Sequence, residues 1–571
     1  MHNDYPTRYS VRELERLHAR GNKKPLEDLM RAWKGIKELP PDDLDSFFRI
    51  GGYHGEPFIY RPWVDNLSEI DTYVYWGGYC NHGNVLFPTW HRVYVYRLEQ
   101  ALQHIVPGVM MAYWDETSVE SLAEGIPHSL TDEKFTFSDD DYNGELKGKT
   151  IDNPLRSFVL PVAVSDEMNV PSQGDINHQY AKPKGYETVR YPLSGLVGTP
   201  EARQATKAHN DQYPDPIGRT QKLNENVIQW LIGKPPTEVT QMPPGQLPKK
   251  LDDEPQPAEE FSIFLRYLRC LDAPNYTVFS NTTSAAAWNH GSEQADIAIP
   301  LEDPHNDVHL AVGGFDLIIE GKEDQDGLLA GANGDMGENN TAALDPIFFF
   351  HHCNVDRMFW VWQKKQQQKQ KLEVIAQYSG TSSTDSQGPT PGFAPNSSLD
   401  LNSPLHPFTK TIDGMEVPYT SEDCIDIENQ LNFTYSIGSL DPDGEEMFQA
   451  EKASHDDRFS SKTLVVTKID RALFQGSFVL RAYAEVGNKT YYLGHHSVLS
   501  RRNVVKCANC LTHLEVNAFF PLSNVPAESV DSGPMNSAEA KDSDPIHYKV
   551  QIHHRGEKLH PNLDIAFHIK G

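Results

Sequence analysis

The sequence contains few cysteines, too few basic residues to balance its acidic ones, and no long hydrophobic run. Six cysteines among 571 residues exclude a small secreted scaffold held together by disulfides. The net charge of −29 argues against nucleic acid or an anionic membrane surface as a partner, because phosphate groups attract basic surfaces. No apolar stretch reaches the ~18 residues that a membrane-spanning helix needs, so no membrane partner is expected.

The start of the chain also lacks a secretory signal peptide. Residues 1–30 carry charged side chains throughout, whereas a signal peptide contains an uninterrupted apolar segment. We therefore expect a cytoplasmic protein. The sequence does not indicate the oligomeric state, and it is compatible with a monomer or an oligomer.

The length and the hydrophobic pattern predict two domains. A chain of 571 residues exceeds the size at which a single core stops growing. Up to residue 440, apolar residues recur at helical spacing, and LDPIFFFHHCNVDRMFWVWQ predicts a long helix with Asp345 as its N-cap and Pro346 in its first position. Residues 441–460 are acidic and unpatterned, as expected of an exposed linker that a protease can reach.

Beyond residue 460 the pattern changes to the alternation that is typical of β-strands. Phe478, Leu480 and Ala482 share one face of a predicted strand, and the dipeptide Gly487-Asn488 predicts a hairpin turn. The expected fold is therefore mainly α, with a helical-bundle domain (residues 1–440), the linker (441–460) and a small antiparallel β-sandwich domain (461–571).

Two histidine-containing stretches in the second half of the helical domain indicate a metal site. In PLEDPHNDVHLAVGG, His305 and His309 are four residues apart, so on a helix they face the same side and can hold one metal ion. His351 and His352 are adjacent in the later predicted helix. Neighbouring side chains on a helix point about 100° apart, so at most one of this pair is expected to join the first two.

A second group of histidines lies near the N-terminus. WGGYCNHGNVLFPTWHR contains His82 in a glycine-rich loop and His91 at a predicted helix start, and His54 precedes them in GGYHGEPF. The chain thus offers two groups of three imidazoles. All-imidazole ligation suits copper, zinc, nickel or iron, and the pattern of a zinc peptidase, H-E-x-x-H, is not present.

Three of these stretches resemble the copper-binding regions of type-3 copper proteins, which are tyrosinases, catechol oxidases and haemocyanins. They are GYCNHGNVLFPTWHR, PHNDVHLAVGG and DPIFFFHHCNVDRMFWVWQ. The sequence is similar to fungal-type tyrosinases with a C-terminal β domain, and SVLSRRNVVKCANCLTHL extends the resemblance into that domain. The resemblance implies a binuclear copper site that uses O₂ as co-substrate.

The resemblance also implies the copper ligands and a covalent link. In fungal members the cysteine of Cys-x-His is joined to the imidazole of the second ligand, which implies a thioether between Cys80 and His82. From spacing alone, Asp356 is expected to orient His352 and Phe348 to pack against it, because each lies four residues away on a helix. The implied ligands are His54, His82 and His91 for one copper ion and His305, His309 and His352 for the other, with His351 as a neighbour.

Three functions are possible within this family: a tyrosinase, a catechol oxidase without monophenolase activity, and a haemocyanin-like O₂-binding protein. Monophenol hydroxylation requires the phenol to lose its proton near the coppers, and a water held by a carboxylate and an amide can act as the general base. Family members with this activity have an Asn after the first ligand of the second copper and a Glu shortly before it. Asn306 and Glu302 occupy these positions, which favours a tyrosinase that acts on small phenols, both tyrosine-like monophenols and catechols, as in melanin-type pigment formation.

The resemblance implies that the β domain covers the copper site of a latent pro-form and inserts an apolar side chain into the substrate pocket. GHHSVLSRR predicts a turn, and its Val498 or Leu499 is the expected plug. His495 and His496 are expected to be solvated residues of this turn, and the alternative is that they bind copper transiently.

The remaining motif is a pair of cysteines. Cys507 and Cys510 have the spacing of a soft-metal or redox pair. The resemblance implies a part in copper loading, and a buried structural pair is the alternative. Cys270, Cys353 and Cys424 have no such neighbours, and we expect them to be buried as small apolar side chains.

Overall fold

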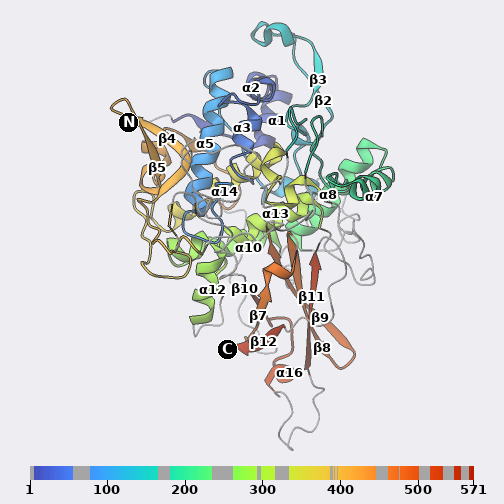
Figure 1. The fold of residues 1–571 in the computed structure, drawn as a ribbon, viewed down its shortest axis with the longest axis vertical. Coiled ribbons are helices and arrows are strands. Elements are labelled where there is room, and N and C mark those ends of the chain that lie inside the picture. Colours follow the sequence, from blue (N-terminus) through green and yellow to red (C-terminus); the bar gives the residue numbers. More distant parts are fainter. Residues whose placement is uncertain are drawn as a thin grey trace, which may run out of the picture.

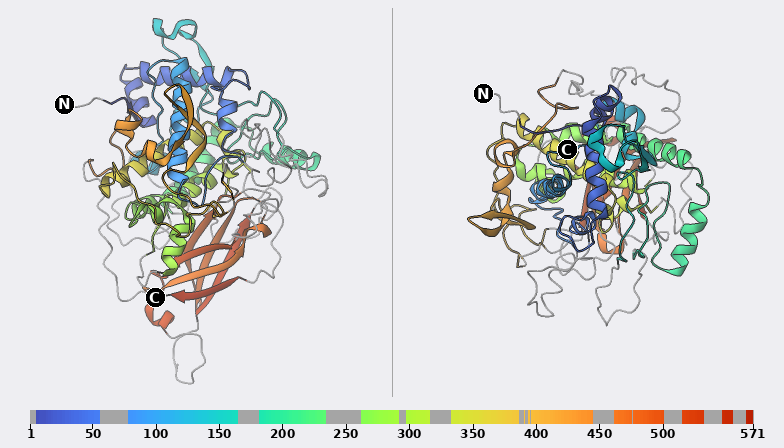
Figure 2. Two further views of the ribbon diagram at one scale, coloured as in Figure 1. Left: turned by 60° about the vertical axis from the view of Figure 1, so that its left-hand side comes forward. Right: turned by 90° about the horizontal axis from the view of Figure 1, so that it is seen from above.

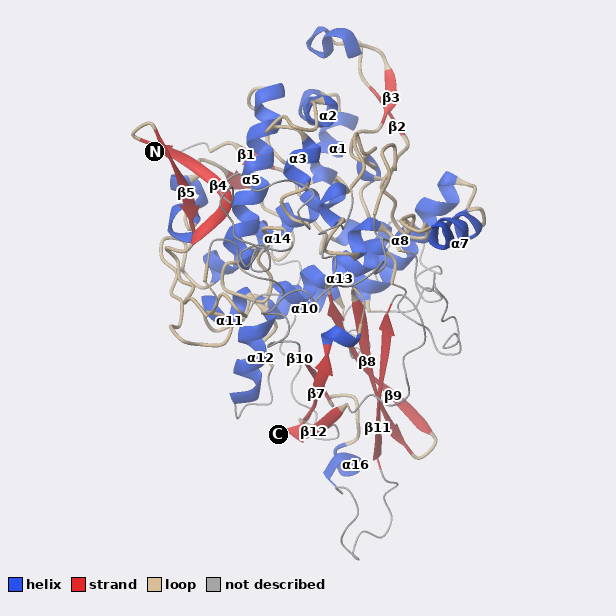
Figure 3. Ribbon diagram, in the orientation of Figure 1, coloured by secondary structure: helices blue, strands red, loops and turns tan. Residues whose placement is uncertain are grey.

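The computed structural model consists of a mainly helical body and a body built mainly of β-strands (Figure 1, Figure 3). It describes residues 5–55, 78–164, 181–233, 262–291, 297–315, 333–385, 390, 393–394, 396–444, 461–474, 476–500, 515–531, 546–554 and 565–570. The expected order, a mainly helical domain followed by antiparallel strands, is confirmed.

The helical domain contains several helices and a few short strands. No helix in the described ranges is long and apolar enough to cross a membrane. The helices are α1 (Val11–Ala19), α2 (Lys24–Glu38), α3 (Phe47–Gly51), α5 (Phe87–Ile105), α6 (Val119–Glu124), α7 (Pro200–Asn210), α8 (Pro216–Ile232), α10 (Ile263–Cys270), α11 (Tyr276–Ser280), α12 (Thr282–Gly291), α13 (Glu302–Gly313), α14 (Ile347–Lys365) and α15 (Ile427–Gln430). The short strands are β1 (Thr7–Arg8), β2 (Lys134–Thr136), β3 (Thr150–Asp152), β4 (Pro404–Ile412), β5 (Met415–Thr420) and β6 (Thr434–Tyr435).

The long helix α14 is the centre of this domain. Asp345 has extended backbone angles (φ −91°, ψ 125°), and its carboxylate accepts a hydrogen bond from the Ile347 amide at 3.1 Å. It therefore caps the helix start with Pro346 between them, as the sequence predicts. Every side chain from Ile347 to Gln363 is buried, which is typical of a helix surrounded by other elements.

The C-terminal domain is a sandwich of two antiparallel sheets. One sheet has the order β10-β7-β12 and the other β11-β8-β9, and the apolar side chains between them form a core of their own. Val486 pairs with Lys489 across the predicted Gly487-Asn488 turn. The strands are β7 (Thr463–Asp470), β8 (Phe478–Val486), β9 (Lys489–Val498), β10 (Glu515–Pro521), β11 (Ile546–His554) and β12 (Ala566–Lys570).

The β domain lies against the helical domain at α10 and α13 (Figure 1, Figure 2). The predicted turn around Val498 is wrong, because β9 continues through His495 and His496 to Val498. His495 is 2% exposed and is not a solvated residue, since it packs between the two domains. Val498 belongs to the β-domain core, whereas Leu499 belongs to the core of the helical domain.

Candidate metal centre

The histidines of both predicted groups meet inside the helical domain. His54 follows α3, and His82 precedes α5. The other four lie within helices: His91 in α5, His305 and His309 in α13, and His352 in α14. All six side chains are at most 1% exposed, so the centre is enclosed by protein.

Each predicted trio forms a compact cluster, and the two clusters touch. In the first trio the ring centroids of His54 and His82 are 5.3 Å apart, and those of His82 and His91 are 5.2 Å apart. In the second, His305 lies 4.6 Å from His309 and 4.8 Å from His352. The rings of His91 and His352 stack at 4.5 Å and join the trios, so the structure brings all six residues together.

Four of these imidazoles make their hydrogen bond through Nδ1. A neutral imidazole has one N–H group, so donation from Nδ1 leaves a lone pair on Nε2 that can bind a metal. The acceptors, carbonyl or amide oxygens, fix the ring orientation, as partners of metal-binding histidines do. The pairs are His54 with the Asn339 carbonyl (3.1 Å), His91 with the Phe87 carbonyl (2.8 Å), His309 with the Met336 carbonyl (2.9 Å) and His305 with Asn306 Oδ1 (3.0 Å).

The Nε2 atoms of the second trio point at one another. His352 Nε2 lies 3.3 Å from the Nε2 atoms of His305 and His309. Burial lowers the pKa of His91 to about 3 and holds the pKa of His305, together with that of His309, well below its ordinary value, so these rings are neutral. His91 Nε2 is buried without a hydrogen-bond partner, and an unsatisfied buried polar atom lowers the stability of the folded protein. A cation shared by such nitrogens removes this cost, and the donor set fits copper.

His351 also lies in the second cluster, although the resemblance implied that it is only a neighbour of the ligands. Its ligand atom is within 4.8 Å of those of His305, His309 and His352. His351 Nδ1 contacts Glu116 Oε1 at 2.6 Å, and burial raises the pKa of Glu116 well above its ordinary value. No sequence signal identifies Glu116, because it lies 235 residues before its partner.

Cys80 lies beside the first trio. Its sulfur and the ligand atoms of His54 and His82 are all within 4.8 Å of one another. Asn339 Nδ2 contacts the Cys80 sulfur at 3.5 Å. The cysteine of the Cys-x-His stretch is therefore placed next to the imidazole to which the resemblance links it.

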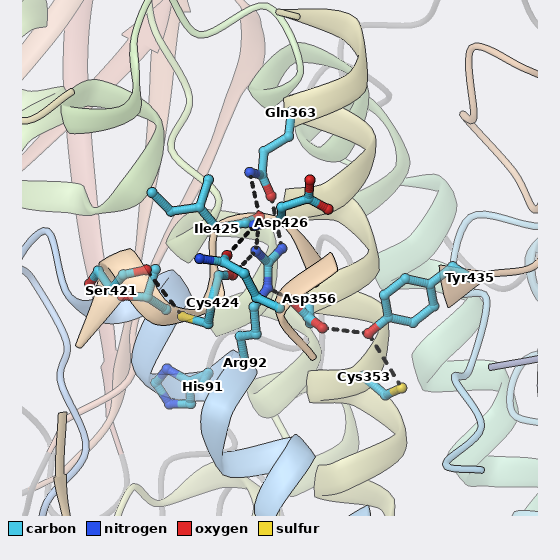
Figure 4. Close-up of polar contacts among 12 residues, drawn as sticks. His91, Arg92, Cys353, Asp356, Gln363, Ser421, Cys424, Ile425, Asp426 and Tyr435 are labelled. Carbon is cyan, nitrogen blue, oxygen red and sulfur yellow. Dashed lines mark hydrogen bonds and ion pairs between the residues drawn. The ribbon is translucent and has the colours of Figure 1, made fainter. Parts of the chain in front are cut away.

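The expectation that Asp356 orients His352 is wrong. Its carboxylate binds Arg92 Nε, Arg8 Nη1 at 3.3 Å and the Tyr435 hydroxyl at 2.6 Å, and Figure 4 shows it between Arg92 and Tyr435. The side chain points across to α5, where Arg92 follows His91. Asp356 thus supports the helix of the first trio. Phe348, in contrast, stacks on the His352 ring at 4.0 Å.

Glu302 and Asn306 both hold segments that carry histidines. The Glu302 carboxylate accepts hydrogen bonds from the amides of Gly83 (2.9 Å) and Thr282 (2.9 Å), and Gly83 follows His82. Burial raises the pKa of Glu302. Asn306 Oδ1 lies 3.0 Å from His305 Nδ1. The predictions for Cys507, Cys510 and linker residues 445–460 concern positions outside the described residues.

Comparisons with known proteins agree with this centre. A family model for the common central domain of tyrosinase matches residues 44–365. Tyrosinase HcTyr2 of Hahella sp. (strain CCB-MM4) is 56% identical over 562 residues, covering 98% of this chain and 93% of that protein. Tyrosinase of Aspergillus oryzae is 37% identical over 534 residues, covering 90% and 88%.

A solved structure extends the agreement to the fold of the whole chain. The tyrosinase from Burkholderia thailandensis at low pH is 53% identical, covers 99% of each chain and superimposes with a TM-score of 0.81. The matched central domain contains both histidine trios, and buried histidines from both lie in clusters whose ligand atoms are close enough to hold metal ions. The chain therefore belongs to the tyrosinase family, whose type-3 centre of two copper ions oxidises monophenols and diphenols.

Proposed function

We propose that this protein hydroxylates small monophenols, oxidises the resulting o-diphenols to o-quinones, and is made as a latent form whose β domain covers the copper centre. The observation that carries the first part is the pair of buried histidine trios, which touch where the ring of His91 stacks on that of His352. His54, His82 and His91 would hold one copper ion and His305, His309 and His352 the other. When bound, the pair of ions would supply O₂ binding, with one oxygen atom entering the ring and the other leaving as water.

The chain's own residues would prepare the phenol for this reaction. A monophenol must lose its proton before it is hydroxylated, and Glu302 and Asn306 are the proposed residues for this step. Burial raises the pKa of the Glu302 carboxylate, which brings it closer to the range of an effective general base. Their hydrogen bonds to Gly83 and His305 also give these two residues a structural role. A test must therefore separate that role from deprotonation of the phenol.

Asn306→Leu is expected to lower monophenol hydroxylation more than diphenol oxidation. Diphenol oxidation falls because His305 loses the oxygen that accepts its Nδ1 hydrogen bond. Hydroxylation falls further because a general base contributes about 10²–10⁴ in rate. The measurement is the ratio of the two initial rates on a matched monophenol and diphenol.

Asn306→Asp is the control, because it keeps an oxygen acceptor for His305 and should leave diphenol oxidation near the wild-type rate. If the leucine variant loses both activities in equal proportion, Asn306 serves only to orient His305, and its proposed part in deprotonation is wrong.

The second part of the proposal, latency, rests on the contact between the two domains. Leu499 is 1% exposed and packs, together with Val479, in the core of the helical domain. Val498 packs instead in the β-domain core. Of the two predicted plugs, Leu499 is therefore the one we propose.

Polar contacts also attach strand β9, which ends at Val498, to helix α13, which carries His305 and His309. Arg266 donates hydrogen bonds to the Asp307 carboxylate (2.6 Å) and to the main-chain carbonyl of His495. His495 Nε2 lies 3.5 Å from Asp307 Oδ1, and its ring meets Trp230 at 4.8 Å. Asp307 stands between His305 and His309 in α13, so β9 is tied to the helix that would hold the second copper ion.

Leu499→Ala is expected to raise phenol oxidation by the intact chain at least tenfold. Truncating a buried leucine costs about 2–5 kcal/mol, and about 1.4 kcal/mol lost from the closed state raises the open population tenfold. Cutting the wild-type chain within residues 445–460 should have a similar effect. Val498→Ala is the control, since Val498 lies in the β-domain core and not in the contact. Full activity of the intact wild-type chain, unchanged by cutting, would show that the β domain does not block the copper centre.

The thioether is a separate prediction. The peptide that contains Cys80 and His82 should be lighter by two hydrogens than its sequence, and Cys80 should resist alkylation in the denatured protein. Cys270, Cys353 and Cys424 are also buried and free of disulfides, so they are internal controls that should react once the chain is unfolded. An alkylated Cys80 in active enzyme would show that no link forms.

A further inference from the structure

One short segment contacts an imidazole of each trio. Residues 333–341, here called the carbonyl loop, contain η6 (Asp335–Gly337). The carbonyl oxygen of Met336 lies 2.9 Å from His309 Nδ1, and that of Asn339 lies 3.1 Å from His54 Nδ1. Since each carbonyl accepts the Nδ1 hydrogen, the loop decides where the Nε2 lone pair of both rings points.

The carbonyl loop is fixed at its N-terminal end by backbone contacts. The Gly334 amide donates to the Gly313 carbonyl at 2.8 Å, and the Asp335 amide donates to the Val189 carbonyl at 2.9 Å. The backbones of Gly313 and Gly337 are so close that a Cβ on Gly313 would lie 2.0 Å from the Gly337 nitrogen. The loop therefore follows the end of α13 closely, and its position depends on how well it is held there.

The Asp335 side chain supplies the polar anchor. Its Oδ2 accepts hydrogen bonds from the Tyr186 hydroxyl at 2.6 Å and the Val189 amide at 2.8 Å. Its Oδ1 lies 3.4 Å from Lys182 Nζ. Asp335 is 2% exposed and Lys182 3%, so water does not screen the pair. These partners belong to a segment, residues 182–189, that contributes no histidine to the centre.

We propose that Asp335 is a positioning residue for both copper ions. By anchoring the carbonyl loop to Lys182 and Tyr186, it holds the two main-chain oxygens that orient His309 in one trio and His54 in the other. Asp335 lies next to Met336 in the chain, so a shift of its side chain moves the Met336 carbonyl directly and the Asn339 carbonyl through the turn between them. This role does not depend on the latency or the phenol chemistry proposed above.

Glu27 offers a matched control for a test of this role. Like Asp335, it is a buried carboxylate that accepts from a tyrosine hydroxyl (Tyr142, 2.6 Å) and a backbone amide (Ser138, 2.8 Å) and faces one basic side chain (His18, 3.3 Å). It also accepts from Ser138 Oγ (2.9 Å) and Asn143 Nδ2 (2.7 Å). It lies in α2, which carries none of the six histidines. Asp335→Asn and Glu27→Gln therefore remove a comparable buried charge, but only the first is at the carbonyl loop.

The two variants are loaded with copper and then titrated with a copper chelator, and the copper retained per chain is measured by elemental analysis. Loss of a group that supports a metal ligand typically weakens metal binding about 10–100-fold. For Asp335→Asn we expect about a tenfold shift of the chelator midpoint for both ions, with a changed visible spectrum of the copper-loaded protein. Glu27→Gln should match the wild type in both measurements. Urea unfolding of the copper-free proteins should show that the two variants lose a similar amount of unfolding free energy.

Copper retention by Asp335→Asn equal to that of Glu27→Gln would overturn the proposal, and so would a loss confined to one ion. If Asp335→Asn yields no folded protein, Tyr186→Phe with Tyr142→Phe as control is the milder pair, because each removes one hydroxyl from the corresponding carboxylate. The expectation is the same: only the Tyr186 variant weakens copper binding, and equal retention by both variants contradicts the role of Asp335.

Discussion

His352→Ala is expected to bind one copper ion in place of two and to lose phenol oxidation, while His351→Ala is expected to keep both ions. His352 Nε2 lies 3.3 Å from the Nε2 atoms of His305 and His309, so it completes the three-nitrogen site. Its ring also stacks on His91 of the other trio. His351 turns its Nδ1 toward Glu116 at 2.6 Å.

The expected effect is large because a direct ligand is removed. Loss of an outer partner alone weakens metal binding about 10–100-fold, and a site left with two nitrogens loses more than that. Elemental analysis gives the copper content, and oxygen uptake with a diphenol gives the activity. The reverse result, with His351→Ala losing an ion and His352→Ala retaining two, would show that the first histidine of the pair is the ligand.

Asp356→Ala is expected to lower the free energy of unfolding of the copper-free protein by about 3–5 kcal/mol, which is the typical cost of leaving a buried charge without its partner. The side chains of Asp356, Arg8 and Arg92 are all 0% exposed. Arg8 keeps a second carboxylate, Glu99, at 2.9 Å. Arg92 keeps only neutral oxygens among its described partners, those of Cys424, Ile425 and Gln363 (Figure 4).

The Arg92–Asp356 pair also joins the two halves of the copper centre. Arg92 follows His91 on α5, and Asp356 lies one turn after His352 on α14. We therefore expect that the folded Asp356→Ala protein also binds less copper. Urea unfolding of copper-free protein measures the first effect, and elemental analysis after reloading measures the second.

A surface ion pair provides the control for this substitution. Lys134 and Asp152 form a bridge with side chains 61% and 90% exposed, and exposed pairs contribute only about 0–1 kcal/mol. Asp152→Ala should therefore leave unfolding almost unchanged. A loss below about 1 kcal/mol for Asp356→Ala would mean that the carbonyl oxygens around Arg92 satisfy it without the carboxylate.

Predictions that depend on neighbours in the chain agree with the structure. The four-residue spacing of His305 and His309 places both on one side of α13, and Phe348 meets His352 for the same reason. The helix start at Asp345 and the hairpin turn at Gly487-Asn488 are equally local. In each case backbone geometry over four or five residues determines the outcome.

Contacts between segments that are distant in the chain could not be predicted from the sequence. Asp356 has the spacing to meet His352, yet its carboxylate meets arginines from α5 and β1. Glu116 reaches His351 from 235 residues away. The role of the Met336 and Asn339 carbonyl oxygens cannot be predicted from residue type, because every residue carries a carbonyl group.

By itself the sequence determined the set of imidazole donors, the order of a helical and a β domain, and the local helix and turn signals, because these depend on residue type and short spacing. Only the tertiary structure decided which ring nitrogen faces the metal, which carboxylate supports which helix, and that Leu499 and not Val498 enters the helical domain. The physical reason is that Val498 ends β9 and Leu499 follows it, and residue type alone does not say which of two adjacent apolar side chains meets the other domain, so the packing of the two domains decides it.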